Sequence, residues 1–342
     1  MNRLLGWRGW NLSATQLFYL LKWEAGTPPM VDDVLVAHLH KMRSWARELF
    51  WFASCNGLDH AWQARDVEPG ERALLNPWVF HQLKEAVSGL NERGCRAAIQ
   101  AIAEAEGRDG AQRMLGESIE VDFDSDLCRR METGSSTMSL PAEAFSGEER
   151  ERVMDKLQTA LAMIDAAAPL AGRLIRNATR TIICRKHSLD ILAAETDPND
   201  IGELRILNPQ LDRYTVVDLV DTLIHESLHN FFAMYELQHG SFVAYQQSAR
   251  LRPVSPWSGN PIPYNAFTHA ILIYFALFHF YLKLYPSGAE FDRSRVESLL
   301  AKCARGFRLE NLDACLRECG ASPSWLFDLY RVMSDDVRAA YA

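Results

Sequence analysis

Two histidines four residues apart are the side chains of this chain best suited to chemistry. His225 and His229 enclose Glu226 in the run His-Glu-Ser-Leu-His. Helix positions i and i+4 share one side, so both imidazoles can reach a single metal ion with bonds of about 2.0–2.1 Å. In zinc peptidases the glutamate of this motif is the general base for a metal-bound water. The spacing predicts a metal centre with Glu226 as the catalytic residue; a pair of buried, hydrogen-bonded histidines is the alternative.

A metal site of this kind needs a third protein ligand. Glu236 lies two helical turns beyond His229, which is too far along the axis for the same ion. His269 is the better candidate, because it stands near the start of the strongly apolar stretch 265–284, where a buried imidazole needs a partner. We expect His269 to complete the site and His279, almost three turns further on, to be a core histidine.

The elements around the motif can be predicted from local patterns. Residues 215–218 (Thr-Val-Val-Asp) resemble a capping box with Asp in place of Glu, so the motif helix should begin there. Asp218 and Asp221 precede the histidines by one to two turns and are expected to orient the imidazoles. Residues 202–208 alternate between polar and apolar, which predicts a half-buried strand leading into the helix.

That strand is a candidate for substrate recognition. An extended peptide can add to the open edge of a sheet through main-chain hydrogen bonds. If the strand is such an edge, Gly202, Leu204 and Ile206 are the residues that bind the substrate.

The rest of the chain predicts a mainly α protein with a small β-sheet, an α+β fold with a zincin-like motif helix in its C-terminal half. The first ~115 residues show helical spacing, with helices expected over 78–90 and 95–105. Residues 116–149 are interpreted as a mostly irregular connection, followed by a helix over 148–168 and a strand over 180–184. We therefore expect a Trp-rich helical domain over 1–147, suited to substrate recognition, and a metal-binding catalytic domain over 148–342.

Composition narrows the possible partners and the location. The net charge is -8 and no basic stripe is present, so nucleic acid is not an expected partner. The apolar stretch 264–285 stands alone and contains two histidines and a lysine, which favours a core helix over a membrane span. The N-terminal residues lack the pattern of a signal peptide, and seven scattered cysteines argue against a disulfide framework. A cytoplasmic enzyme without a membrane partner is expected.

From Gly202 onward the chain resembles the HExxH-motif proteins that accompany ribosomally made, modified peptides. The resemblance rests on three stretches: 202–209, the motif region 221–229, and a downstream block. That block consists of Ser-Pro-Trp at 255–257, prolines at 261 and 263, and His-Ala at 269–270. Members of the family are described as iron- and 2-oxoglutarate-dependent peptide β-hydroxylases.

The resemblance implies functions for residues of the downstream block. His269 would be a metal ligand beside the histidine pair, and Trp257 would contact the substrate. Family members often carry arginine where this chain has Ser258 and Ile262. Since an Arg fork suits a carboxylate, the nearby Arg250 and Arg252 are expected to hold 2-oxoglutarate instead.

Three functions follow for the chain. The first is an Fe(II)- and 2-oxoglutarate-dependent oxygenase that hydroxylates a side chain, at its β-carbon, in a ribosomally made peptide. The second is a zinc-dependent peptidase or hydrolase, in which Glu226 activates a zinc-bound water. The third is a peptide-binding scaffold that performs no chemistry.

Overall fold

The computed structural model describes residues 14–24, 30–58, 69–107, 113–123, 142–243, 250–286, 291–308 and 324–341. This part of the chain is mainly helical with one small five-stranded sheet, which confirms the α+β class. It forms two compact units. The motif unit comprises the described residues within 29–238 and 281–297, and the terminal unit those within 1–28, 239–280 and 298–342. The predicted domain boundary at residue 147 therefore falls inside the motif unit.

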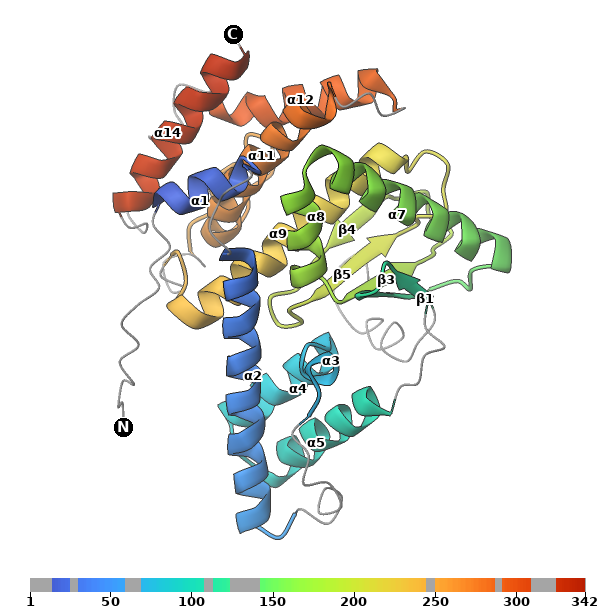
Figure 1. Cartoon of the computed structure of the whole chain (residues 1–342), viewed down its shortest axis with the longest axis vertical. Coiled ribbons are helices and arrows are strands. Elements are labelled where there is room, and N and C mark those ends of the chain that lie inside the picture. The colour runs from blue at the N-terminus through green and yellow to red at the C-terminus, as the bar shows by residue number, and fades with distance from the viewer. Residues whose placement is uncertain are drawn as a thin grey trace. The chain divides into compact units, whose positions relative to one another are not determined.

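Six helices of the described residues precede the motif helix in the motif unit. They are α2 (Met30–Cys55), α3 (Glu71–Leu74), α4 (Pro77–Ser88), α5 (Glu92–Glu106), α7 (Gly147–Ala167) and α8 (Pro169–Ala178), of which α7 runs beside the strands in Figure 1. Asn76 and Asn91 cap α4 and α5 through their side-chain oxygens. Ser146 and Glu149 form a capping box on α7. The helices predicted over 78–90, 95–105 and 148–168 are confirmed, with small shifts at their ends.

The sheet contains β1 (Arg113–Leu115), β2 (Ile119–Asp122), β3 (Thr181–Arg185), β4 (Ala193–Glu195) and β5 (Glu203–Leu207). Its order is β1-β2-β3-β5-β4, with β2, β3 and β5 parallel and the two outer strands antiparallel to their neighbours. The strands predicted over 180–184 and 202–208 are confirmed. Gly116, at φ 62°, turns the chain between β1 and β2. The expectation of irregular structure from residue 116 is therefore wrong for β2, which is too short to show a period in the sequence.

The expectation that 202–208 forms an edge is also wrong. β5 lies between β3 and β4 and pairs with both. Leu204 and Ile206 are fully buried. The Gly202 N–H donates to Asn230 at 3.0 Å, and the Gly202 carbonyl accepts from the Arg180 N–H at 2.7 Å. The main-chain groups of the predicted substrate-binding residues are thus paired within the protein, so an extended peptide cannot add to β5. The outer strand beside β5 is β4, whose Ala-Ala-Glu sequence gives no strand signal.

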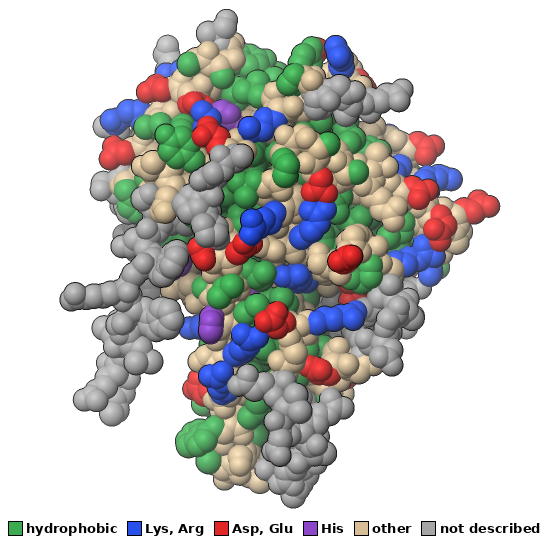
Figure 2. Space-filling view, in the orientation of Figure 1, with side chains coloured by type: hydrophobic (Ala, Val, Ile, Leu, Met, Phe, Trp, Pro, Cys, Tyr) green, Lys and Arg blue, Asp and Glu red, His purple; other side chains and the backbone are tan. Residues whose placement is uncertain are grey.

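The motif helix is α9 (Val216–His239), and it begins as predicted. The Thr215 N–H donates to Asp218 Oδ2 at 3.0 Å, and the Asp218 N–H donates to Thr215 Oγ1 at 3.2 Å. The other helices are α1 (Ala14–Leu21), α11 (Tyr264–Leu284), α12 (Arg293–Phe307) and α14 (Ser324–Tyr341). Among the described residues α11 is the one helix long and apolar enough to cross a membrane. In the apolar window that qualifies it, 89% of the residues are buried, as in a core helix. Basic and acidic side chains are interspersed on the face shown in Figure 2.

Candidate metal site on helix α9

Helix α9 is held to the sheet by polar contacts on the side away from its two motif histidines. The hydroxyls of Ser227 and Thr179 lie 2.8 Å apart, and the Asn230 side chain donates to the Glu203 carbonyl at 3.0 Å. Ser227 is two residues from each histidine, so it lies on the opposite side of the helix. His225 and His229 remain only partly buried, while Ser227 and Asn230 are buried. With its polar side chains bonded on the buried side, α9 leaves the two imidazoles accessible along one stripe of its surface, which we call the accessible stripe.

The two imidazoles lie close to each other on α9. The ring centroids of His225 and His229 lie 5.1 Å apart, with an angle of 53° between the ring planes. A metal–nitrogen bond of about 2.0–2.1 Å on each ring is compatible with that separation. Imidazole nitrogens suit iron as well as zinc, so this donor set fits both metals that the sequence suggests.

Glu226 occupies a different environment from the two histidines. Its side of α9 is buried, with 8% of the residue exposed, and Oε2 accepts a hydrogen bond from the Thr196 hydroxyl at 3.1 Å. Burial raises the pKa of the Glu226 carboxyl to about 8; the Thr196 bond opposes this, and the charges of Glu195 and Asp221 add to it. The carboxyl is thus directed to the β4–β5 connection rather than along the accessible stripe.

A charged cluster holds that connection in place. Arg205 on β5 contacts Glu203, donates to Asp200 at 2.7 Å and lies 3.4 Å from Glu195. Asp200 also pairs with His81 of α4 at 2.9 Å. Burial raises the pKa of Glu203 to about 7, and the adjacent Arg205 opposes the shift. Thr196 follows β4 directly, so this cluster positions the partner of Glu226. The sequence gives no local signal for Thr196, because the contact is created by the tertiary fold.

The two acidic residues that precede the motif have partners on other elements, and their expected role in orienting the imidazoles stays a prediction. Asp218 caps the helix through Oδ2, and its Oδ1 accepts from Arg295 at 2.8 Å. Asp221 accepts from the Tyr281 hydroxyl at 2.6 Å through Oδ1. The capping position and the neighbouring helix ends provide these partners, so both aspartates stabilise the ends and flank of α9.

The predicted third ligand belongs to the terminal unit. His269 is 9% exposed, and its ring lies edge-on to Phe242 at 5.8 Å. Among the described residues, no three His, Cys, Asp or Glu side chains are grouped as a metal ion would require. The structure therefore brings His225 and His229 together, and the participation of His269 stays a prediction. His279 pairs with Asp336 at 2.7 Å and is 7% exposed, which confirms a core histidine.

The other residues predicted from the downstream block are also placed in the terminal unit. Arg250 and Arg252 are exposed. Trp257 is 3% exposed, stacks on Tyr274 at 4.6 Å and donates from Nε1 to the Cys303 carbonyl at 3.0 Å. With its ring and its N–H both occupied inside a core, Trp257 is a packing residue, and the expectation of a substrate contact is not supported by its position.

Comparison with known proteins adds no family to these observations. No family model matches the chain, and no curated protein matches it with significance.

Proposed function

We propose that the chain is a cytoplasmic metal-dependent enzyme whose reaction centre is the accessible stripe of α9. The proposal rests on one observation: His225 and His229 present partly buried imidazoles 5.1 Å apart on one side of a well-anchored helix. The zincin-like character of this helix, with His269 as the third ligand, is part of the proposal. Bound iron would supply oxidative chemistry, and bound zinc would supply Lewis acidity.

Of the two reactions, we favour hydroxylation of a peptide with Fe(II) and 2-oxoglutarate. The environment of Glu226 supports this choice. A hydrolase needs that carboxylate beside a metal-bound water, whereas Glu226 is buried and bonded to Thr196 at 3.1 Å. An oxygenase does not need the carboxylate as a base for attacking water. The resemblance of the block at 255–270 to peptide hydroxylases points the same way.

The zinc hydrolase remains a second candidate because of the position of β4. This strand has no other strand neighbour than β5 among the described residues, and its residues are partly exposed. Thr196, the residue after β4, contacts Glu226. A peptide that extended the sheet at β4 would thus run close to the acidic residue of the motif. In both proposals β4, rather than β5, is the element that receives an extended peptide.

The test begins with metal binding by the protein stripped of metal. We expect Fe(II), added without oxygen, and Zn(II) to bind at one equivalent each. His225→Ala and His229→Ala should each abolish stoichiometric binding, whereas His40→Ala, which removes an exposed histidine of α2, should not. Equal binding by wild type and both motif variants would contradict the metal site.

The second step distinguishes the reactions. Adding 2-oxoglutarate to the anaerobic Fe(II) protein should produce a weak visible charge-transfer band, and air should then yield succinate. If Arg252 holds the carboxylate of 2-oxoglutarate, Arg252→Ala should lower the affinity for 2-oxoglutarate at least tenfold, about 1.4 kcal/mol. Stoichiometric metal binding with neither a charge-transfer band nor succinate would exclude the oxygenase reaction. Peptide cleavage by the zinc-loaded protein would then establish the hydrolase reaction.

A further inference from the structure

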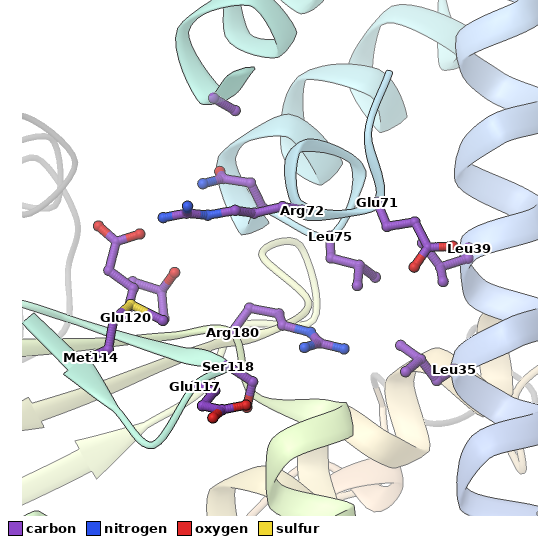
Figure 3. A pocket seen from close by; sticks show the side chains of 13 residues that line it. Leu35, Leu39, Glu71, Arg72, Leu75, Met114, Glu117, Ser118, Glu120 and Arg180 are labelled. Carbon is purple, nitrogen blue, oxygen red and sulfur yellow. The ribbon is translucent and has the colours of Figure 1, made fainter. Parts of the chain in front are cut away.

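A cavity of about 460 Å³ lies in the motif unit, away from the histidine pair. Figure 3 shows its walls: α2, the α3–α4 region, the end of α5, the β1–β2 hairpin and the start of β3. Leu35, Leu39 and Leu75 supply an apolar wall, and Arg180 extends its guanidinium into the space between them. The proposed function uses none of these residues.

Two buried polar atoms on side chains that line this cavity have no hydrogen-bond partner among the described residues. Among the described residues, neither Nε of Arg180 nor Oγ of Ser118 has a hydrogen-bond partner, although both atoms are buried. Burial lowers the pKa of Arg180, and the charge of Glu71 only partly offsets this. Glu71 itself is bonded to Arg43 at 2.8 Å. Unpaired buried donors of this kind are costly, and a cation and a hydroxyl together suit an oxyanion.

Backbone hydrogen bonds hold Arg180 in this position. Its N–H donates to the Gly202 carbonyl at 2.7 Å, and its carbonyl accepts from the Glu120 N–H at 2.8 Å. The aliphatic part of the side chain crosses Gly202, where an added Cβ would lie 3.6 Å from Arg180 Cγ. Gly202 has φ +96°, which favours glycine at this crossing. Sheet pairing and this packing therefore fix the stem and direct the guanidinium into the cavity.

The other charged side chains of the lining limit the charge that a ligand of this cavity can carry. Besides Arg180, the lining contains one basic side chain, Arg72, and three acidic ones, Glu71, Glu117 and Glu120. Three carboxylates around two cations disfavour a ligand with two negative charges. The leucine wall favours an aliphatic portion.

We propose that this cavity binds a monocarboxylate with an apolar tail, whose carboxylate is held by Arg180 and Ser118. The carboxylate belongs either to a small free acid or to the C-terminal end of a peptide. This site is independent of the proposed metal chemistry, because it uses neither the motif helix nor its histidines.

Calorimetric titration of the full-length protein with hexanoate tests the proposal. Hexanoate should bind, and hexan-1-ol, adipate and inorganic phosphate should bind at least tenfold more weakly. Arg180→Gln should lower the affinity for hexanoate at least tenfold, about 1.4 kcal/mol. Arg96→Gln, which removes an exposed arginine of α5, should leave the affinity unchanged. No hexanoate binding by the wild type, equal binding by Arg180→Gln, or tighter binding of phosphate would overturn the proposal.

Two further measurements guard against a misfolded variant. Ser118→Ala removes only a hydroxyl and should lower the affinity for hexanoate by about threefold or more. In the wild type, the ring NMR signals of buried His38 report on Arg180, whose charge acts on this imidazole. Hexanoate added at pH 7, where it is a carboxylate, should shift those signals, and unchanged signals with hexanoate bound would place the ligand elsewhere and contradict the assignment.

A last titration identifies the source of the carboxylate. A short acetylated peptide ending in leucine is compared with its C-terminal amide. Tighter binding of the acid form than of hexanoate would support a peptide end as the ligand, and binding of hexanoate alone would support a small free acid.

Discussion

At the scale of single residues, Glu226 separates the two enzymatic proposals. Glu226→Gln keeps the shape of the side chain and its contact with Thr196 but removes the carboxylate. In an oxygenase this variant should keep its metal and still form succinate from 2-oxoglutarate. In a hydrolase it should keep its metal and lose about 10²-fold or more in peptide cleavage, because the general base is gone. Glu48→Gln, which changes an exposed glutamate of α2 outside the proposed reaction centre, is the control and should change neither activity.

His38 provides a prediction for stability against pH. It is 1% exposed on α2, its ring lies 5.6 Å from that of Phe80, and burial together with the Arg180 charge lowers its pKa to about 4. A histidine whose pKa is lower in the folded state stabilises the fold above its unfolded pKa of about 6.5. That contribution is lost as the pH falls from about 6.5 through 4. We expect the lost contribution to be about 3 kcal/mol.

The measurement is urea unfolding from pH 7.5 to 4 for wild type, His38→Leu and His40→Gln. The free energy of unfolding of His38→Leu should fall less steeply with acid than that of the wild type. His40 is exposed on the same helix, so His40→Gln should follow the wild type. Parallel curves for wild type and His38→Leu would contradict the prediction.

At the scale of elements, α12 depends on a glycine that lets Trp257 approach it. A Cβ built on Gly306 would lie 2.3 Å from Cζ2 of Trp257. The indole cannot move easily, because it stacks on Tyr274 and donates to the Cys303 carbonyl. Gly306→Ala should therefore destabilise the protein by about 1–3 kcal/mol, although alanine is the better helix former.

Gly147 is the matched control, since it begins α7 and an added Cβ there meets nothing within 4 Å. Gly147→Ala should leave the melting temperature unchanged or raise it slightly. Equal melting temperatures of Gly306→Ala and wild type would show that Trp257 is not held as tightly as its contacts indicate.

At the scale of the whole molecule, the chain should contain seven thiols and no disulfide. Cys55, Cys95, Cys184 and Cys303 carry thiols, and all but Cys55 are buried. Cys128, Cys315 and Cys319 lie outside the described residues. Thiol titration of the denatured, unreduced protein should find seven groups, whereas the folded protein should react more slowly at its buried thiols. A total of five in the denatured protein would reveal a disulfide.

The sequence by itself determined those features that local pattern controls. The helix over 216–239 was predictable because its capping box and its apolar spacing act within a few residues. The same holds for the pairing of His225 with His229, which a helix imposes at i and i+4. Strands β3 and β5 were predictable from the pattern of their apolar residues, and the burial of α11 was predictable from its composition.

Only the tertiary structure decided which strand is an edge and which partners the polar side chains acquire. β4 is three residues long, so its pairing with β5 has no local signal, yet it makes β5 an interior strand. Thr196 meets Glu226 across 30 residues, and Tyr281 meets Asp221 across 60. In the sequence, Arg180 is only the first residue of a predicted strand. Its cavity exists because helices and a hairpin distant in the chain enclose it, and packing between remote segments cannot be inferred from spacing alone.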